Sequence, residues 1–109
     1  MLNQVVMVGR LVEDPQAKEL EGGNKVMNIT LAVPRSYKNT EGEYETDFID
    51  CTLWKGIAAN TEEFCKKGDL IGIKGRIETS IWEDKEKNKR KTQQVIAEKV
   101  TFLSPKTKE

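Results

Sequence analysis

The sequence contains no histidine, and this absence excludes several kinds of site at once. Without histidine there is no Ser–His or Cys–His nucleophile pair, and the usual zinc-ligand sets cannot form. The two cysteines, Cys51 and Cys65, are separated by thirteen residues and have no second pair to complete a zinc site. No phosphate-cradling loop of the GxxxxGK[ST] type is present. We therefore expect no enzymatic activity, no metal and no cofactor.

Long hydrophobic runs are also missing. Near the start, the apolar run from Val5 to Val8 has only four residues and ends at Gly9, which is far short of a signal-peptide core or a membrane-spanning helix. We therefore expect no association with a membrane, and a cytoplasmic location. With 109 residues, the chain is long enough for one domain that folds without disulfides, and too short for two.

The chain has no excess of charge of either sign, because 18 Lys and Arg residues balance 18 Asp and Glu residues. Their distribution is uneven: residues 1–54 hold 5 basic and 9 acidic residues, a net charge of −4, whereas residues 55–109 hold 13 and 9, a net charge of +4. Segment 85–91 alone holds five basic residues and one acidic residue, and segment 41–50 holds five acidic residues and no basic one. The basic segment suits a phosphate backbone or a solvated hairpin, and the acidic one opposes phosphate binding.

What the sequence does contain is apolar alternation with a period of two, which is typical of β-strands. The apolar residues of segment 25–33 share one face, as do Ile49, Cys51 and Leu53 of the next strand. Pro34 predicts a strand end because it lacks an N–H for the ladder, and residues 35–46 read as a long loop or flexible hairpin. The predicted strands are residues 3–12, 25–33, 48–54, 70–82 and 92–102. In the fourth, the residues expected on one face are Ile71, Ile73, Ile77 and Ile81.

One helix is predicted between the third and fourth strands, with an apolar stripe at helical spacing. Lys66 and Lys67 are expected near its C-terminus and Gly68 at its end. The stripe consists of Ile57, Ala58, Thr61, Phe64 and Cys65. Five strands with one short helix in this place predict an all-β fold, the five-stranded oligonucleotide/oligosaccharide-binding (OB) barrel. The glycines expected at turns, bulges or bends are Gly9, Gly22, Gly23, Gly42, Gly72 and Gly75.

Aromatic residues provide the strongest functional signal. Phe48 and Trp54 have the non-core parity of the third strand, Trp82 shares its parity with Lys74 and Arg76, and Tyr37 lies in the polar loop. Rings beside cations on a solvent face suit base stacking and phosphate attraction on single-stranded nucleic acid. The structural alternative is that these rings pack under the loop, against a second subunit or over the barrel end. The two cysteines have core positions and are expected to be buried.

Nine short blocks extend through nearly the whole chain: MLN (1–3), VGRL (8–11), DP (14–15), ITLAV (29–33), DFI (47–49), WK (54–55), FCKKG (64–68), GRI (75–77) and WE (82–83). In order and spacing these blocks resemble the bacterial single-stranded DNA-binding proteins of the OB fold. The resemblance implies a homotetramer in which first strands pair across a dimer contact, with residues such as Val6 and Val8 at the interface. It also implies binding and protection of single-stranded DNA in replication, recombination and repair, without strong sequence preference.

The resemblance also implies roles for particular residues. The stacking positions of the family fall on Tyr37, Phe48, Trp54 and Trp82. Its basic positions map onto Arg35, Lys55, Lys74 and Arg76, and more loosely onto Lys87, Lys89 and Arg90.

Two departures from the family pattern concern binding and recruitment. Ser80 stands where many relatives have a basic residue, and Glu78 adds a negative charge nearby. We expect an OB-fold DNA-binding domain over residues 1–105 and a short remnant at 106–109 without the family's acidic tail, so recruitment of replication or repair proteins through a tail is not expected. Three other functions stay open: a protein-interaction module, an OB protein that binds structured RNA or acts in primosome assembly, and a hydrolase.

Overall fold

Alternating apolar residues build the barrel of the computed structural model, which describes residues 1–104. The strands and the helix, in chain order, are β1 (Val5–Leu11), β2 (Lys18–Glu19), β3 (Lys25–Lys38), β4 (Tyr44–Trp54), α1 (Lys55–Phe64), β5 (Leu70–Glu83) and β6 (Lys89–Phe102). The five long strands are the five that the sequence predicts, and the two-residue β2 is an addition. The predicted remnant, residues 106–109, lies outside the described residues.

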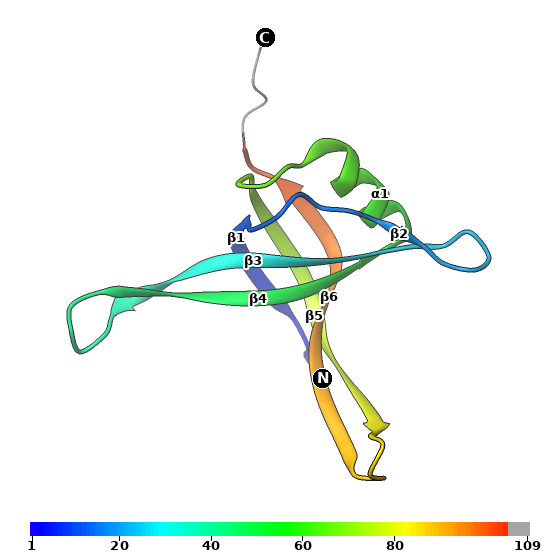
Figure 1. Cartoon of the computed structure of the whole chain (residues 1–109). Coiled ribbons are helices and arrows are strands. Elements are labelled where there is room, and N and C mark those ends of the chain that lie inside the picture. Colours follow the sequence, from blue (N-terminus) through cyan, green and yellow to red (C-terminus); the bar gives the residue numbers. More distant parts are fainter. Residues whose placement is uncertain (105–109) are drawn as a thin grey trace.

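The strands form one sheet in the order β1-β5-β6-β4-β3-β2, and the pairing of β1 with β3 closes the sheet into a barrel (Figure 1). Closure is antiparallel, with Arg10 opposite Ala32 and Leu11 opposite Leu31. β4 and β6 pair in parallel over a short stretch. The helix lies between β4 and β5, the third and fourth long strands. The predicted all-β OB architecture is therefore confirmed.

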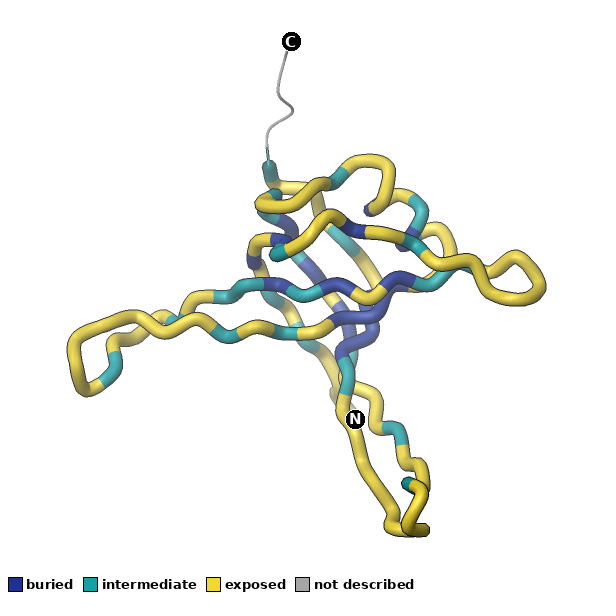
Figure 2. Tube along the Cα trace, in the orientation of Figure 1, coloured by how far each residue is buried: buried dark blue, intermediate teal, exposed yellow. Residues whose placement is uncertain are grey.

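The core lies inside the barrel and consists of the residues with the predicted inward parity. Met27 pairs with Leu53 across β3 and β4, and Leu31 with Ile49. Cys51 is buried among them, and burial raises the pKa of its thiol to about 11. Cys65 is half-buried and packs against the same core. Figure 2 shows the buried residues gathered in the centre of the barrel, while three hairpins extend from it and are almost entirely exposed.

Two of these hairpins are long arms, in which the strands extend further than the sequence predicts. Of the long loop or flexible hairpin expected at 35–46, the structure has the hairpin. The strand end predicted at Pro34 is wrong, because β3 continues to Lys38 and β4 begins at Tyr44 (Figure 1). Pro34 pairs with Thr46, and the register shifts between Pro34 and Lys38. The proline is tolerated because the other edge of β3 has no strand partner here within the described residues. We name this hairpin, residues 33–48, the β3–β4 arm.

The second arm, residues 77–95 of β5 and β6, corrects another expectation. Ile71 and Ile73 are buried, as their parity predicts. Ile77 and Ile81 share that parity but are exposed, because β5 has left the barrel and has no opposing core layer to cover them (Figure 2). We name this hairpin the β5–β6 arm.

The helix ends one residue before Cys65, the last residue of its predicted stripe, which is the C-cap. It ends at Phe64, and its last turn contains no basic residue, so Lys66 and Lys67 lie in the following turn rather than on the helix. Thr61 is fully buried and donates its hydroxyl to the carbonyl oxygen of Ile57 (2.8 Å). Gly68 has a φ of +90°, as a turn glycine should.

Gly9 has a different role from the one predicted, because it lies within β1 rather than at a bulge or turn. A Cβ at Gly9 would lie 2.8 Å from the carbonyl oxygen of Ala32 and 2.9 Å from Cγ2 of Val33. Glycine is therefore required by the close approach of β3 where the barrel closes. The bend predicted at Gly75 is confirmed, since the β5–β6 register shifts between Lys74 and Gly75.

Candidate nucleic-acid interface

The outer face of β4 carries two exposed rings. Phe48 is 67% exposed and Trp54 is 41% exposed. Successive side chains of a strand point to opposite faces, so these rings share the outer face with Asp50 and Thr52, which lie between them. On β3, the outward partners of Phe48 and Trp54 are the small or aliphatic Ala32 and Val26, so the rings stand above their neighbours.

A ladder of polar side chains crosses four strands between these two rings. The hydroxyl of Thr52 lies 3.1 Å from the amide oxygen of Asn28 on β3 and 3.1 Å from that of Gln94 on β6. Gln94 in turn donates from Nε2 to the hydroxyl of Ser80 on β5 (3.1 Å). The sequence places Thr52 and Asn28 on the outward faces of their strands, but it does not predict that they join Gln94 in one ladder. Their pairing depends on the strand order.

The other two predicted aromatic residues lie on the arms. Trp82 is 50% exposed on the β5–β6 arm, and its indole N–H donates to the hydroxyl of Thr92 (3.3 Å). Tyr37 is 63% exposed on the β3–β4 arm. Tyr44 is a further exposed ring that the sequence analysis missed, because residues 35–46 show no alternation from which a face could be assigned. The Lys38 ammonium lies 5.7 Å from the centroid of its ring.

A shallow groove opens beside Phe48, where β4 and β6 diverge. Their parallel pairing is limited to Cys51 with Val95 and Thr52 with Ile96. The groove has a volume of about 310 Å³ and is lined by Phe48, Ile49, Asp50, Ile77, Gln93, Gln94 and Val95. It therefore places an exposed ring, an aliphatic wall and amide groups side by side at the roots of both arms.

The arginines predicted to contact phosphate are engaged with carboxylates. Arg35 binds Asp47 with two nitrogens, Nε at 3.1 Å and Nη2 at 3.0 Å, and binds Glu45 from Nη1 at 2.7 Å. This hydrogen-bonded pair raises the pKa of Arg35 and lowers that of Asp47. Arg76 is held in the same way by Glu78 and Glu98. The hydrogen bond with Glu78 is the main cause that raises the pKa of Arg76.

The tip of the β5–β6 arm has one further ion pair, between Nε of Arg90 and Asp84 (3.0 Å). Lys87 and Lys89 lie in the same tip and are exposed. Within residues 1–104, every ion pair shorter than 4.0 Å uses an arginine, so the lysines remain the available cations of this surface.

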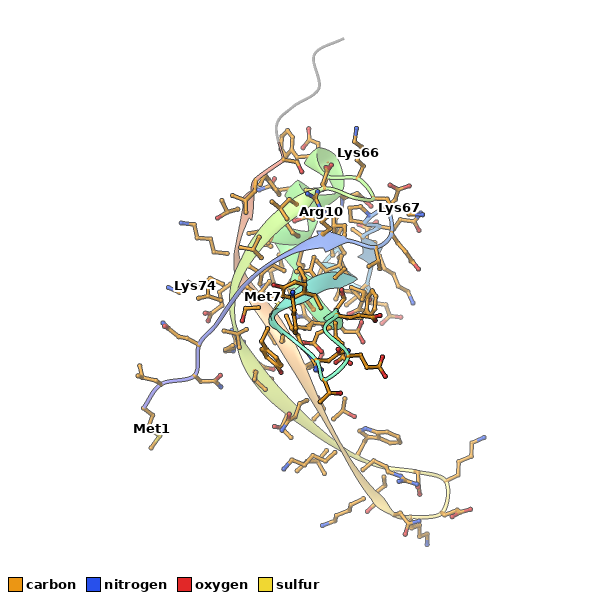
Figure 3. The ribbon with its side chains drawn as sticks, turned by 90° about the vertical axis from the view of Figure 1, so that its left-hand side faces the viewer. Met1, Met7, Arg10, Lys66, Lys67 and Lys74 are labelled. Atoms are coloured by element: carbon orange, nitrogen blue, oxygen red, sulfur yellow. The ribbon has the colours of Figure 1, made fainter. Side chains whose placement is uncertain are left out.

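The two remaining predicted cations lie on different sides of the barrel. Lys55 follows Trp54 directly as the first residue of α1, and its φ is +52°. Lys74 pairs with Val6 of β1 and lines a groove with Val8 and Leu103. Figure 3 shows Lys74 pointing away from the barrel on the side of the N-terminus. Lys55 therefore lies beside the aromatic face, whereas Lys74 lies on the β1 face.

The acidic segment 41–50 acquires a structural role on the β3–β4 arm. Glu45 and Asp47 neutralise Arg35 across the two strands, and Asp50 accepts a hydrogen bond from the hydroxyl of Thr30 (2.7 Å). Glu45 and Asp47 join the two strands of the arm, and Asp50 joins β3 and β4 outside the arm, through contacts that the sequence pattern alone does not specify.

Comparison with known proteins identifies the family. Residues 2–103 match the model of the single-strand binding protein family. The chain belongs to this family. It is 45% identical over 109 residues to "Single-stranded DNA-binding protein B" of Bacillus subtilis (strain 168), a match that covers all of this chain and 96% of that protein. It is 44% identical over 106 residues to "Single-stranded DNA-binding protein" of Halalkalibacterium halodurans, covering 97% of this chain and 63% of that protein.

No helix within residues 1–104 has the length and apolar character that crossing a membrane requires. In the same part of the chain, no three His, Cys, Asp or Glu side chains form a group that could hold a metal ion.

Proposed function

We propose that this chain binds single-stranded DNA without strong sequence preference, and that it protects the strand during replication, recombination and repair. The observation that carries this proposal is the outer face of β4, where exposed Phe48 and Trp54 flank a hydrogen-bonded polar ladder. Rings of this kind stack on any base, because every base has a π-face. The names of the relatives support the same ligand. The proposal includes a cytoplasmic location, because bacterial DNA lies there.

In the proposed complex, bases stack on Phe48 and Trp54, and the strand continues along the arms to Tyr37 and Trp82. Phosphates are neutralised mainly by lysines, because the arginines of this surface already have carboxylate partners. Three exposed lysines are assigned to this role: Lys55 beside Trp54, and Lys87 and Lys89 at the tip of the β5–β6 arm.

We also propose that the chain forms a homotetramer and that the outer face of β1 supplies one of its contacts. Val6 is 75% exposed and Val8 is also exposed. Both line an apolar groove of about 240 Å³ with Leu103. Sedimentation equilibrium should give four chains per particle, and Val6→Glu should lower that number. A monomer in the unmodified protein would contradict this part of the proposal.

Fluorescence anisotropy of a labelled oligo(dT) tests the proposed ligand. Saturable binding should resist unlabelled duplex DNA and weaken as salt rises. If a structured RNA displaces the labelled oligo(dT) as well as unlabelled oligo(dT) does, the RNA-binding alternative is favoured. Absence of oligo(dT) binding at low salt would favour a protein-interaction module.

Variants of the rings test the proposed face. Trp54→Ala and Phe48→Ala should each weaken binding by about 1–3 kcal/mol, the contribution of one stacked base. Phe64→Ala is the matched control, because its exposed ring packs on Phe102 and lies outside this face. Equal affinities of the three variants would remove the β4 rings from the mechanism.

A further inference from the structure

A β-bulge in β6 places Glu98 where the regular ladder would not. Lys74 pairs with Lys99 and Gly75 pairs with Ala97, so Glu98 has no partner on β5. A bulge of this kind bends the strand and redirects the extra side chain. Gly75 permits it, because a Cβ at that position would overlap the backbone oxygen of Ile96.

The redirected carboxylate completes a three-residue cluster on Arg76. Nη1 of Arg76 donates to Glu98 (3.2 Å), while Nε (2.9 Å) and Nη2 donate to the same oxygen of Glu78. All three guanidinium nitrogens therefore have a carboxylate partner. The cluster of Arg76, Glu78 and Glu98 has a net charge of −1, although its arginine is one of the residues that the sequence predicts to contact phosphate. We name it the Arg76 cluster.

The Arg76 cluster lies on the outer face of β5 and β6, and the strand register connects it to the Trp54 end of β4. Arg76 pairs with Ile96 across β5 and β6, and Ile96 pairs with Thr52 across β6 and β4. Trp54 and Glu98 each follow the Thr52–Ile96 pair by two residues on these neighbouring strands. A strand with a base on Trp54 therefore brings its phosphates to a site where two carboxylates already bind the arginine.

We propose that Glu78 and Glu98 are affinity-determining residues that compete with DNA phosphate for Arg76. This inference rests on the proposed binding of single-stranded DNA. The two carboxylates weaken that binding, whereas the exposed rings and lysines of the surface strengthen it. A phosphate gains the arginine only by displacing carboxylates that bind it with good geometry, and it meets a locally negative field before it does so. The cluster thus lowers the affinity of the interface and lets a bound strand leave or slide more readily.

Removal of one carboxylate charge should tighten binding. Glu98→Gln and Glu78→Gln keep the size of the side chain, and each removes one of the two carboxylates that compete with a phosphate for Arg76. One additional phosphate contact steepens the dependence of log K on log salt by about 0.7 for a single strand, which corresponds to about fivefold tighter binding at 0.1 M salt. Glu63→Gln on α1 is the matched control, because it makes the same change in net charge at an exposed residue for which no ion pair is found within residues 1–104.

A double-mutant cycle separates release of the arginine from a general loss of negative charge. In an Arg76→Gln background, Glu98→Gln should no longer tighten binding of labelled oligo(dT) beyond the effect of Glu63→Gln. Anisotropy titrations at several salt concentrations measure this, and thermal melts verify that each variant folds. The two glutamate variants are independent, so failure of one to fold leaves the other as the test.

Three outcomes would overturn the inference. Weaker binding by Glu98→Gln and Glu78→Gln would show that the carboxylates orient Arg76 for DNA, and unchanged binding would show that the arginine is not on the path. Equal tightening in the Arg76→Gln background would show a general charge effect. In each of these cases the unmodified protein still binds DNA, whereas loss of that binding would overturn the proposed function as well.

Discussion

The two arms end in the same five-residue turn, but with different residues at the position of positive φ. In each turn the fourth residue donates its N–H to the carbonyl of the first, at 3.1 Å in segment 39–43 and 3.0 Å in segment 84–88. The side chains of Asn39 and Asp84 also accept the N–H groups of the third and fifth residues. The fourth residue is Gly42 (φ +78°) in one turn and Lys87 (φ +64°) in the other.

Lys87→Gly should therefore stabilise the protein while it weakens DNA binding. A side chain in the left-handed region costs about 1–2 kcal/mol. The added freedom of glycine in the unfolded chain costs about 0.4–1 kcal/mol. The expected net gain is about 0.5–1 kcal/mol, which for a domain of this size raises Tm by about 2–4 °C. Loss of one phosphate contact should reduce the salt slope by about 0.7.

Thermal melts at equal protein concentration and oligo(dT) titrations measure the two effects. Lys85→Gly is the matched control, because it removes the same charge from the same turn at a residue without positive φ. It should lower or preserve Tm. A Lys87→Gly variant whose Tm falls as far as that of the control would refute the strain argument, and one that keeps its full salt slope would remove Lys87 from the phosphate path.

The remaining predictions concern the barrel and its ionisable groups. Gly75→Ala should destabilise the protein severely in a urea titration, because the added Cβ would overlap the backbone of β6. Gly72→Ala is the control and should be tolerated, because a Cβ at Gly72 would make only ordinary contacts. A thiol reagent at pH 8 should modify half-buried Cys65 and leave Cys51, with its pKa of about 11, unmodified until urea unfolds the chain; simultaneous reaction would contradict the burial. Backbone hydrogen bonds, chiefly from Asn88, lower the pKa of Asp84 in the folded protein. The ionised Asp84 therefore stabilises the fold fully above the unfolded-state pKa of about 4, and this stabilisation is lost as the pH falls through the lower pKa of the folded state. Asp84→Asn should flatten Tm against pH below pH 4, and an unchanged profile would oppose this assignment.

The barrel could be predicted from the sequence because its core strands are short amphipathic runs. The inward parity of segments 25–33 and 48–54 is decided by burial on one face, and a shift of one residue would expose the whole set. The full length of the arms could not be predicted in this way, because neither of their faces is buried. Pro34 and the polar residues after it have the composition of a loop, and only pairing across the hairpin makes them strands.

The aromatic half of the candidate site was predictable for the same reason. Phe48 and Trp54 have outward parity in a strand whose other face is core, so their exposure follows from the alternation. The availability of the basic residues of the site could not be predicted from the sequence. Whether Arg76 is available depends on a bulge that aims Glu98 at it, and charge counts along the chain do not contain that contact.

The most direct test of the account is the fluorescence of Trp54 in a Trp82→Phe variant, in which it is the sole tryptophan. Titration with oligo(dT) should quench this emission saturably, over the same concentration range in which anisotropy reports binding. Binding by anisotropy without any change in the emission of Trp54 would contradict stacking on the outer face of β4.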